Sequence, residues 1–360
     1  MRRMLNIVAL GAVIIAGIGT YAVNGEQNPD DWKLQVDSNE AAWKNRTVRV
    51  SYTGTNQALK DVELSVEGNQ YVYGSYIDEV FRYREDVGKQ YRSFARAVKQ
   101  LGYDLRIKTE DGYVAVGQEG LDTLVLLKSK DGETVERTEF TDVQFLLESG
   151  WSGLFVYKDA VHLVYNENYE LTNQHIAVLN QETKTIETKK IERNGVLIEN
   201  VITDAMGVEF TVEEQMTIGT DNRYIPIEAT RLETVEAEDG ETYSESFSLS
   251  GLYVYDVKEN RVVSLDSEQD VVASTVFGHT YQSILADGTE TSINLKTLAE
   301  TSRQVIQGKI GMASYHNALL YHVYSTQSGA EINVFDESTL VSKGTVTGAD
   351  VAKSVQYYVY

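Results

Sequence analysis

A chain of 360 residues is longer than one small hydrophobic core requires, and 42% hydrophobic with 24% charged residues is typical of a folded protein. With 54 acidic residues against 32 basic residues the formal net charge is −22, and a surface this negative repels nucleic acid. The absence of cysteine excludes disulfides, thiol nucleophiles, cysteine-ligated metals and a lipid anchor of the bacterial lipoprotein type. The chain has 23 tyrosines and only 2 prolines, a bias that favours β-structure because tyrosine suits half-buried pleated surfaces.

The N-terminus carries a hydrophobic segment. Leu5 to Val23 contains no charged residue, follows Arg2 and Arg3, and as a helix would be roughly 28 Å long, close to the hydrocarbon thickness of a bilayer. Basic residues before the segment predict an N-terminus inside the cell and a body outside it. We expect a single-pass signal anchor over residues 1–23. A cleaved secretory signal ending near Thr20-Tyr21-Ala22 is the alternative and would give a secreted protein. A buried core helix is a third reading.

After an expected linker over 24–45, the body at 46–360 repeats one pattern. Alternating strand-like runs are interrupted by Asp or Asn followed by small or polar residues, at Asn180, Asp256, Asn294 and Asp336. These side chains initiate turns because they accept hydrogen bonds from backbone N–H groups two residues on, so each interruption predicts a hairpin. A second set of turns falls between them, at Asn69, Asp111, Asp159, near Asp204, and at Asp239, His279 and Asn317.

Two hairpins in a period of about 40 residues give four strands per unit, the arrangement of a propeller blade. The segments Asp256–Leu265, Asn294–Val305 and Asp336–Val341 resemble β-propellers with WD40-like or YVTN-like blades. The resemblance spans about residues 105–350 and implies architecture only, because the Trp-Asp and Gly-His landmarks of WD40 blades are missing. We therefore predict an all-β β-propeller, with seven blades of about 40 residues. A β-sandwich or a pair of them is the alternative.

Two strand-like segments lie at the ends of this body. Residues 46–52 read RTVRVSY and residues 355–360 read VQYYVY. We expect the two to pair, which would close the ring and remove exposed strand edges.

One segment has a helical period. We expect an inserted amphipathic helix at about 87–101, where Gly102 suits the C-terminal cap. The apolar residues that recur at helical spacing are Tyr91, Phe94, Ala95, Val98 and Leu101. The opposite face is basic: Lys89, Arg92, Arg96 and Lys99. These four are the candidate binding residues, for an anionic membrane, wall component or acidic protein. The alternative is a solvated helix face without a ligand.

Motifs of catalysis are missing from the sequence. It contains no His-Glu-x-x-His zinc motif, no nucleophile elbow and no phosphate-binding glycine loop. His279 and His316 fall in equivalent turns of successive blades, where two histidines with a nearby acid could bind a metal, but exposed turn histidines commonly bind nothing. Asp266 to Asp270 lacks the ligand pattern of a calcium loop. We predict no catalytic residue, no metal and no cofactor.

These patterns favour a non-enzymatic binding or scaffold protein, tethered to the outer face of the membrane and recognising a protein or an anionic wall or membrane component. A secreted polysaccharide hydrolase or lyase on the same fold is the alternative, because 54 acids allow many carboxylate pairs. A regulatory partner of another membrane protein is a third hypothesis. Nucleic acid is not an expected partner.

Overall fold

The computed structural model describes most of the chain beyond the N-terminal segment. The described residues are 32–44, 46–53, 59–72, 92–170, 172–192, 195–202, 217–236, 242–265, 271–308, 310–316, 318–348 and 353–359. The predicted anchor at Leu5–Val23 and the turn positions Asp204, Asp239 and Asn317 therefore lie outside them. No helix within these ranges is both long enough and apolar enough to span a bilayer.

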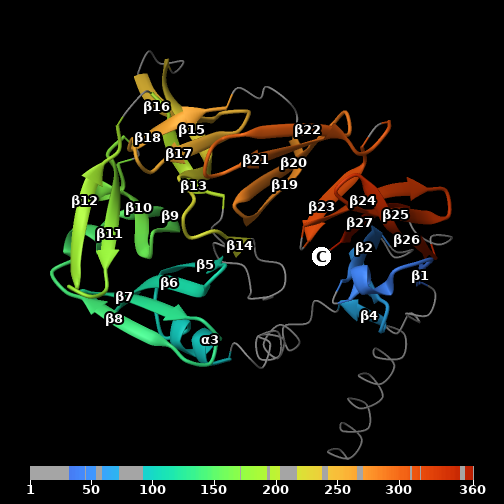
Figure 1. Ribbon diagram of the computed structural model, residues 1–360, viewed down its shortest axis with the longest axis horizontal. Helices are drawn as coiled ribbons and strands as arrows, with labels where there is room; N and C mark the ends of the chain where they lie inside the picture. Colours follow the sequence, from blue (N-terminus) through green and yellow to red (C-terminus); the bar gives the residue numbers. More distant parts are fainter. Residues whose placement is uncertain are drawn as a thin grey trace, which may run out of the picture.

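The described strands form six antiparallel four-stranded units that follow one another around a central region (Figure 1). The first unit is β27 (Lys353–Val359), β2 (Val48–Thr53), β3 (Leu59–Ser65) and β4 (Gly68–Val72). The second is β5 (Asp104–Thr109), β6 (Gly112–Glu119), β7 (Thr123–Ser129) and β8 (Glu136–Phe140). The third is β9 (Gly150–Tyr157), β10 (Ala160–Asn166), β11 (Gln174–Asn180) and β12 (Thr185–Lys190).

The other three units follow in chain order. The fourth is β13 (Leu197–Val201), β15 (Tyr224–Glu236), β17 (Tyr253–Asp256) and β18 (Arg261–Ser264), with β16 (Thr242–Ser248) paired to the long β15. The fifth is β19 (Val271–Gly278), β20 (Thr280–Leu285), β21 (Thr289–Asn294) and β22 (Glu300–Gln304). The sixth is β23 (Met312–His316), β24 (Leu319–Thr326), β25 (Gly329–Asp336) and β26 (Thr339–Thr347), and β1 (Lys33–Val36) is added beside β26.

The inner strands of neighbouring units lie side by side, β5 with β9, β9 with β13, β19 with β23 and β23 with β27. The cores lie between the sheets: Leu105 and Val116 of the second unit share one cluster with Leu154 and Leu163 of the third. The chain thus has the β-propeller-like, all-β architecture that its repeats predict.

The expected turn chemistry is present where the third strand of a unit meets the fourth. The side-chain oxygen of Asn180 accepts bonds from the N–H groups of Glu182 and Thr183, at 3.0 and 3.1 Å. Asp256 and Asn294 accept equivalent bonds in their own hairpins. These short polar side chains thus replace backbone partners at the turn, which is why the strands stop there.

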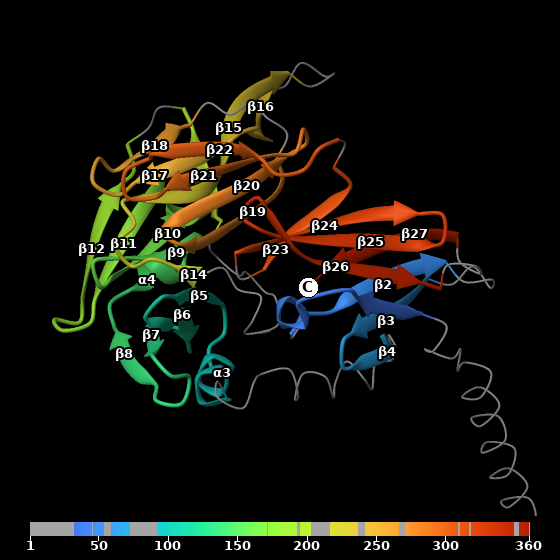
Figure 2. The ribbon, with the colours of Figure 1, turned by 45° about the vertical axis from the view of Figure 1, so that its right-hand side comes forward.

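The predicted pairing of the chain ends is confirmed. β2 and β27 are antiparallel neighbours, with Val48 opposite Val359 and Val50 opposite Tyr357 (Figure 2). All four of these side chains are buried. The first unit is therefore built from both ends of the folded body, as ring closure requires.

The described strands give six units, one fewer than the predicted seven. The interval from Asn180 to Asp256 is about twice the expected period, and the sequence suggests an extra unit there. The structure instead places a single unit in this interval, with β14 (Thr217–Ile218) and β16 inserted into it. The turn expected at Asp239 falls between β15 and β16, which form an extension of that unit.

Part of the predicted linker 24–45 belongs to the folded body. β1 pairs with β26, and the short helix η2 (Glu40–Trp43) follows it. Trp32 and Trp43 are both almost completely buried, in the core shared by the first and sixth units. The linker prediction is wrong for these residues because two large aromatic rings must leave water, and they do so between the two sheets.

Helix α3 (Arg92–Val98) lies within the predicted range 87–101, of which the described part begins at residue 92. Phe94, Ala95 and Val98 are buried against β6 and β7, in a cluster with Tyr113 and Leu127. Two other short helices, α4 (Gln144–Leu147) and η4 (Glu167–Tyr169), connect strands of the second and third units. α3 therefore covers the second unit with its apolar face.

Candidate functional site where three parallel strands end

The inserted strand β14 lies between inner strands of two different units. It pairs in parallel with β5 on one side and with β19 on the other, joining the second and fifth units into one nine-stranded sheet. Because the three strands run in the same direction, their C-terminal ends meet at one edge. Glu110 follows β5, Asp221 lies three residues beyond β14, and His279 follows β19.

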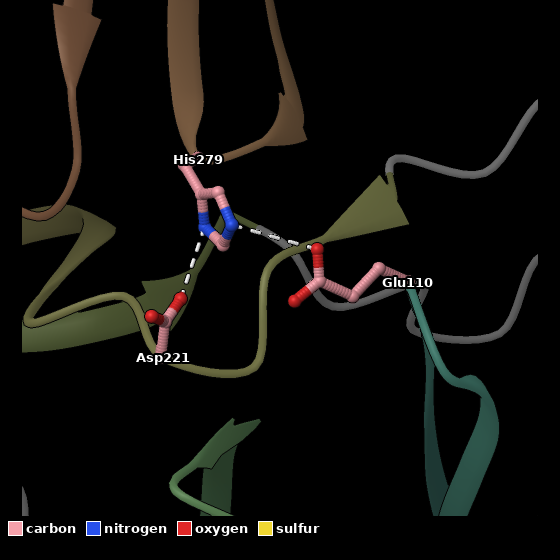
Figure 3. Close-up of side chains that lie close together, drawn as sticks. All are labelled: Glu110, Asp221 and His279. Carbon is pink, nitrogen blue, oxygen red and sulfur yellow. Dashed lines mark ion pairs between the residues drawn. The ribbon is translucent and has the colours of Figure 1, made fainter.

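These three side chains converge on each other (Figure 3). His279 Nε2 lies 3.5 Å from Glu110 Oε2, and His279 Nδ1 lies 3.3 Å from Asp221 Oδ1. The imidazole therefore stands between two carboxylates. The side chains are 31% exposed for His279, 39% for Glu110 and 52% for Asp221, so solvent and small ions can reach them.

The position of the imidazole depends on a glycine. A Cβ on Gly219 would lie 2.1 Å from His279 Nδ1, so only glycine lets the ring lie against this backbone. The Gly219 N–H donates to the Gly278 carbonyl at 2.7 Å, and the Glu110 N–H donates to Ile218 at 3.0 Å. The backbone thus ties all three strand ends together.

A buried amide orients the ring. Asn222 is completely buried, its Nδ2 donates to the Gly278 carbonyl at 3.0 Å, and its Oδ1 lies 2.8 Å from His279 Nδ1. Because the carbonyl acceptor fixes which end of the amide is the donor, Oδ1 must be the atom that faces the imidazole. The His279 Nδ1 therefore carries a proton and donates it to Asn222.

Thr220 and Arg223 hold the rest of the segment. Thr220 donates through its N–H and its hydroxyl to Glu110 Oε1, at 3.1 and 3.2 Å, which leaves Oε2 facing the imidazole. Arg223 binds both carboxylate oxygens of Asp256 at 2.9 and 2.7 Å. The hydrogen bond from Lys296 Nζ, at 2.8 Å, lowers the pKa of Asp221 below its ordinary value.

A cavity of about 520 Å³ adjoins this site, between the second and third units. Its lining includes Asp111, Lys128, Lys130, Asp159 and Thr220. Lys128 Nζ donates to the Asp159 carbonyl at 3.1 Å, and partial burial lowers the pKa of its ammonium group. Both polar and apolar side chains line the cavity, and Thr220 is common to it and to the Glu110 contacts.

The basic residues predicted as a binding face are elsewhere. Arg96 and Lys99 are exposed on the side of the α3 segment away from its buried face. Arg92 begins α3, and Lys89 lies outside the described residues. The structure does not test whether they bind anything, so their role stays a prediction.

Only part of the cluster was visible in the sequence. His279 lies in the turn between β19 and β20, and its expected neighbour His316 ends β23, the first strand of the next unit. His316 bonds instead to the Val359 carbonyl at 2.9 Å, and burial lowers its pKa to about 4. Glu110 was visible only as one acid beside the predicted turn at Asp111, while Asp221 lay outside every predicted turn.

Comparison with known proteins gives low similarity. No family model and no curated protein matches the chain. Among solved structures, U3-55K is 11% identical to this chain, with a TM-score of 0.30. The matched region covers 67% of this chain and 64% of the U3-55K chain. BamB from Moraxella catarrhalis is 13% identical, with a TM-score of 0.30, and the match covers 67% of this chain and 62% of the BamB chain. Apo AztD from Citrobacter koseri is 8% identical, with a TM-score of 0.25, and the match covers 87% of this chain and 98% of the AztD chain.

The chain thus spans less than two thirds of the length of U3-55K and of BamB. Likenesses this low support no conclusion about function, and the β-propeller-like architecture follows from the six units described above.

Proposed function

We propose that the chain is a non-enzymatic extracytoplasmic binding protein, built on a β-propeller-like scaffold and tethered to the membrane by Leu5–Val23. The uncharged segment after Arg2 and Arg3 supports the tether. The scaffold supports binding, because loops from several units meet at one edge beside a cavity of about 520 Å³.

The displaced carboxyl groups favour binding over polysaccharide cleavage. A glycosidase needs one carboxyl group with a raised pKa to protonate the leaving group. Among the described residues, three carboxyl groups have a clearly displaced pKa, and all three are displaced downward: Asp131, Asp221 and Asp256. The Asp131 pKa is lowered by the N–H groups of Thr134 and Glu133. At Asp256 burial alone would raise the pKa, but the hydrogen bonds from Arg223 and from the N–H groups of Glu259 and Lys258 together outweigh it. These carboxylates are held ionised, which suits turns and ion pairs.

The α3 segment is the surface for an anionic partner. The single observation that carries this is the amphipathic packing of the helix: Phe94, Ala95 and Val98 are buried and Arg96 and Lys99 are exposed. On a chain with a net charge of −22, a local basic face attracts anionic wall polymers, lipid headgroups or an acidic protein surface.

The test is charge reversal with a matched control. The full chain in detergent, carrying Arg96→Glu and Lys99→Glu, is co-sedimented with an insoluble anionic wall polymer. Each basic residue near an anionic surface contributes about 1 kcal/mol, so binding should fall more than about tenfold. The control reverses two other exposed lysines, Lys258 and Lys343, and should bind nearly as the unchanged chain does. Equal binding by all three proteins would refute the basic-face proposal.

The tether has its own measurement. Extraction of cell membranes at alkaline pH should leave the chain in the membrane pellet, and protease added outside the cell should digest the body. Recovery of the chain in the soluble fraction would contradict the anchor and favour the cleaved signal.

A further inference from the structure

We propose that Glu110, Asp221 and His279 form a binding site for a divalent transition-metal ion, of which Zn²⁺ is the reference case. This inference does not depend on the basic face of α3. It rests on the distances within the cluster, the tautomer of His279 and the arrangement that holds both carboxylates.

The distance from His279 Nε2 to Glu110 Oε2 matches two ligands of one ion. At 3.5 Å it is longer than a normal N–H···O hydrogen bond. Two ligand atoms at about 2.1 Å from a tetrahedral zinc ion are about 3.4 Å apart. One ligand atom from each of Glu110, Asp221 and His279 lies within 4.8 Å of the others, so Asp221 can complete the set.

The tautomer of His279 leaves the required lone pair. Because Asn222 Oδ1 accepts the Nδ1 proton, a neutral ring has its lone pair on Nε2, the atom that faces Glu110. In the neutral ring this lone pair faces a carboxylate oxygen, and a cation between the two atoms would make the contact favourable. A metal-binding histidine typically donates its other N–H to a carboxylate or carbonyl oxygen, and Asn222 Oδ1 supplies that oxygen here.

A second histidine–glutamate pair in the chain shows the contrast. His175 Nε2 lies 3.6 Å from Glu167 Oε2, nearly the same separation. The same nitrogen, however, is 3.2 Å from Asn173 Oδ1, and that oxygen also accepts a bond from Lys190 Nζ at 2.8 Å. Glu167 Oε2 already accepts a hydrogen bond from Asn173 Nδ2, and among the described residues no second carboxylate joins this pair. His175 therefore lacks the features of a metal ligand and serves as the matched control.

The donor set defines the class of ion. One imidazole nitrogen and two carboxylate oxygens suit zinc and its first-row neighbours, whereas calcium and magnesium prefer oxygen-only sites. Three protein ligands leave at least one coordination position open. Because the cluster is part-exposed and the cavity lies beside Thr220, that position is accessible to water or to a ligand group.

The experiment titrates metal into the full chain. The protein is purified in detergent without a histidine tag, stripped with chelator, and titrated with ZnCl₂ by calorimetry and with Co²⁺ by visible absorption. We expect one equivalent to bind and the Co²⁺ complex to show the absorption of a tetrahedral site. Glu110→Gln and His279→Gln should each lower affinity at least about 100-fold, and His175→Gln should not change it.

Gly219→Ala tests positioning, because its Cβ would displace the imidazole without removing a ligand. It should lower affinity about 10- to 100-fold. The absence of saturable zinc binding by the unchanged chain would overturn the proposal. Equal zinc affinity in the Glu110→Gln and His279→Gln variants would also overturn it, because the bound zinc would then be an adventitious ion only. Nitrogen NMR of the imidazole is independent of the variants: zinc should shift the His279 Nε2 resonance, and an Nε2 proton that persists in excess zinc would also overturn the proposal.

Discussion

The contact between Trp43 and Gly344 tests whether residues 32–44 belong to the folded body. Trp43 is fully buried, its Nε1 donates to Ser342 Oγ at 2.8 Å, and its ring meets Tyr321 edge-on at 5.8 Å between centroids. A Cβ on Gly344 would lie 2.5 Å from the Trp43 ring. Gly344 lies in β26, so alanine should be acceptable there apart from this contact.

The magnitudes follow from that geometry. Trp43→Ala removes a large buried ring and should lower the free energy of unfolding by about 3–5 kcal/mol. Gly344→Ala forces a methyl group into the ring and should cost about 1–3 kcal/mol. In the double variant the methyl group occupies space vacated by the ring, so the two losses should be less than additive by most of the Gly344 cost.

The assay is urea unfolding followed by circular dichroism, at equal protein concentration for the four proteins of the cycle. We expect the effects of Trp43→Ala and Gly344→Ala on the free energy of unfolding to be coupled by about 1 kcal/mol or more. Strictly additive losses of unfolding free energy would refute the packing of Trp43 on β26. A small loss in the Trp43→Ala variant would mean that residues 32–44 are a linker after all.

Two further predictions concern stability. Burial, with a smaller effect from Lys189, lowers the pKa of His162 to about 4 from the ordinary 6.5, so the unfolded chain binds a proton that the folded chain cannot hold. Stability should therefore fall as the pH decreases from 6.5 to about 4, by about 2–3 kcal/mol from this residue, and His162→Gln should flatten that part of a pH series of urea unfolding curves. Deletion of residues 353–360 should abolish cooperative unfolding because β2 loses its partner β27, and an unchanged transition would contradict the role of that pairing.

The sequence predicts the repeating part of the fold because each signal is local. Asn180, Asp256 and Asn294 act on N–H groups two and three residues away, so the hairpins are encoded within a few positions. The pairing of β2 with β27 was also predictable, since two strand-like ends without other partners remain once the hairpins are assigned. The burial of Trp43 was not, because its partners Tyr321 and Ser342 come from strands at the opposite end of the chain.

The metal-ligand cluster could not be predicted from the sequence for a related reason. Its three members come from turns far apart in the chain, and they meet only because β14 pairs with both β5 and β19. β14 has only two residues, too few for an alternating pattern to be recognised. His279 was visible as a turn residue, but its expected neighbour His316 bonds to the Val359 carbonyl instead.

The irregular interval between Asn180 and Asp256 links these outcomes. The segment that disturbs the repeat, and where the described residues form one unit fewer than predicted, is the segment that supplies β14, Gly219 and Asp221. A propeller unit needs only its four strands for stability, so an insertion that leaves its own unit to pair with two others requires a separate explanation. The geometry supplies one: the insertion brings a carboxylate and a glycine against His279, opposite Glu110. Departures from the repeat are therefore where function should be sought in this chain, and metal titration of the Gly219→Ala variant tests that reasoning directly.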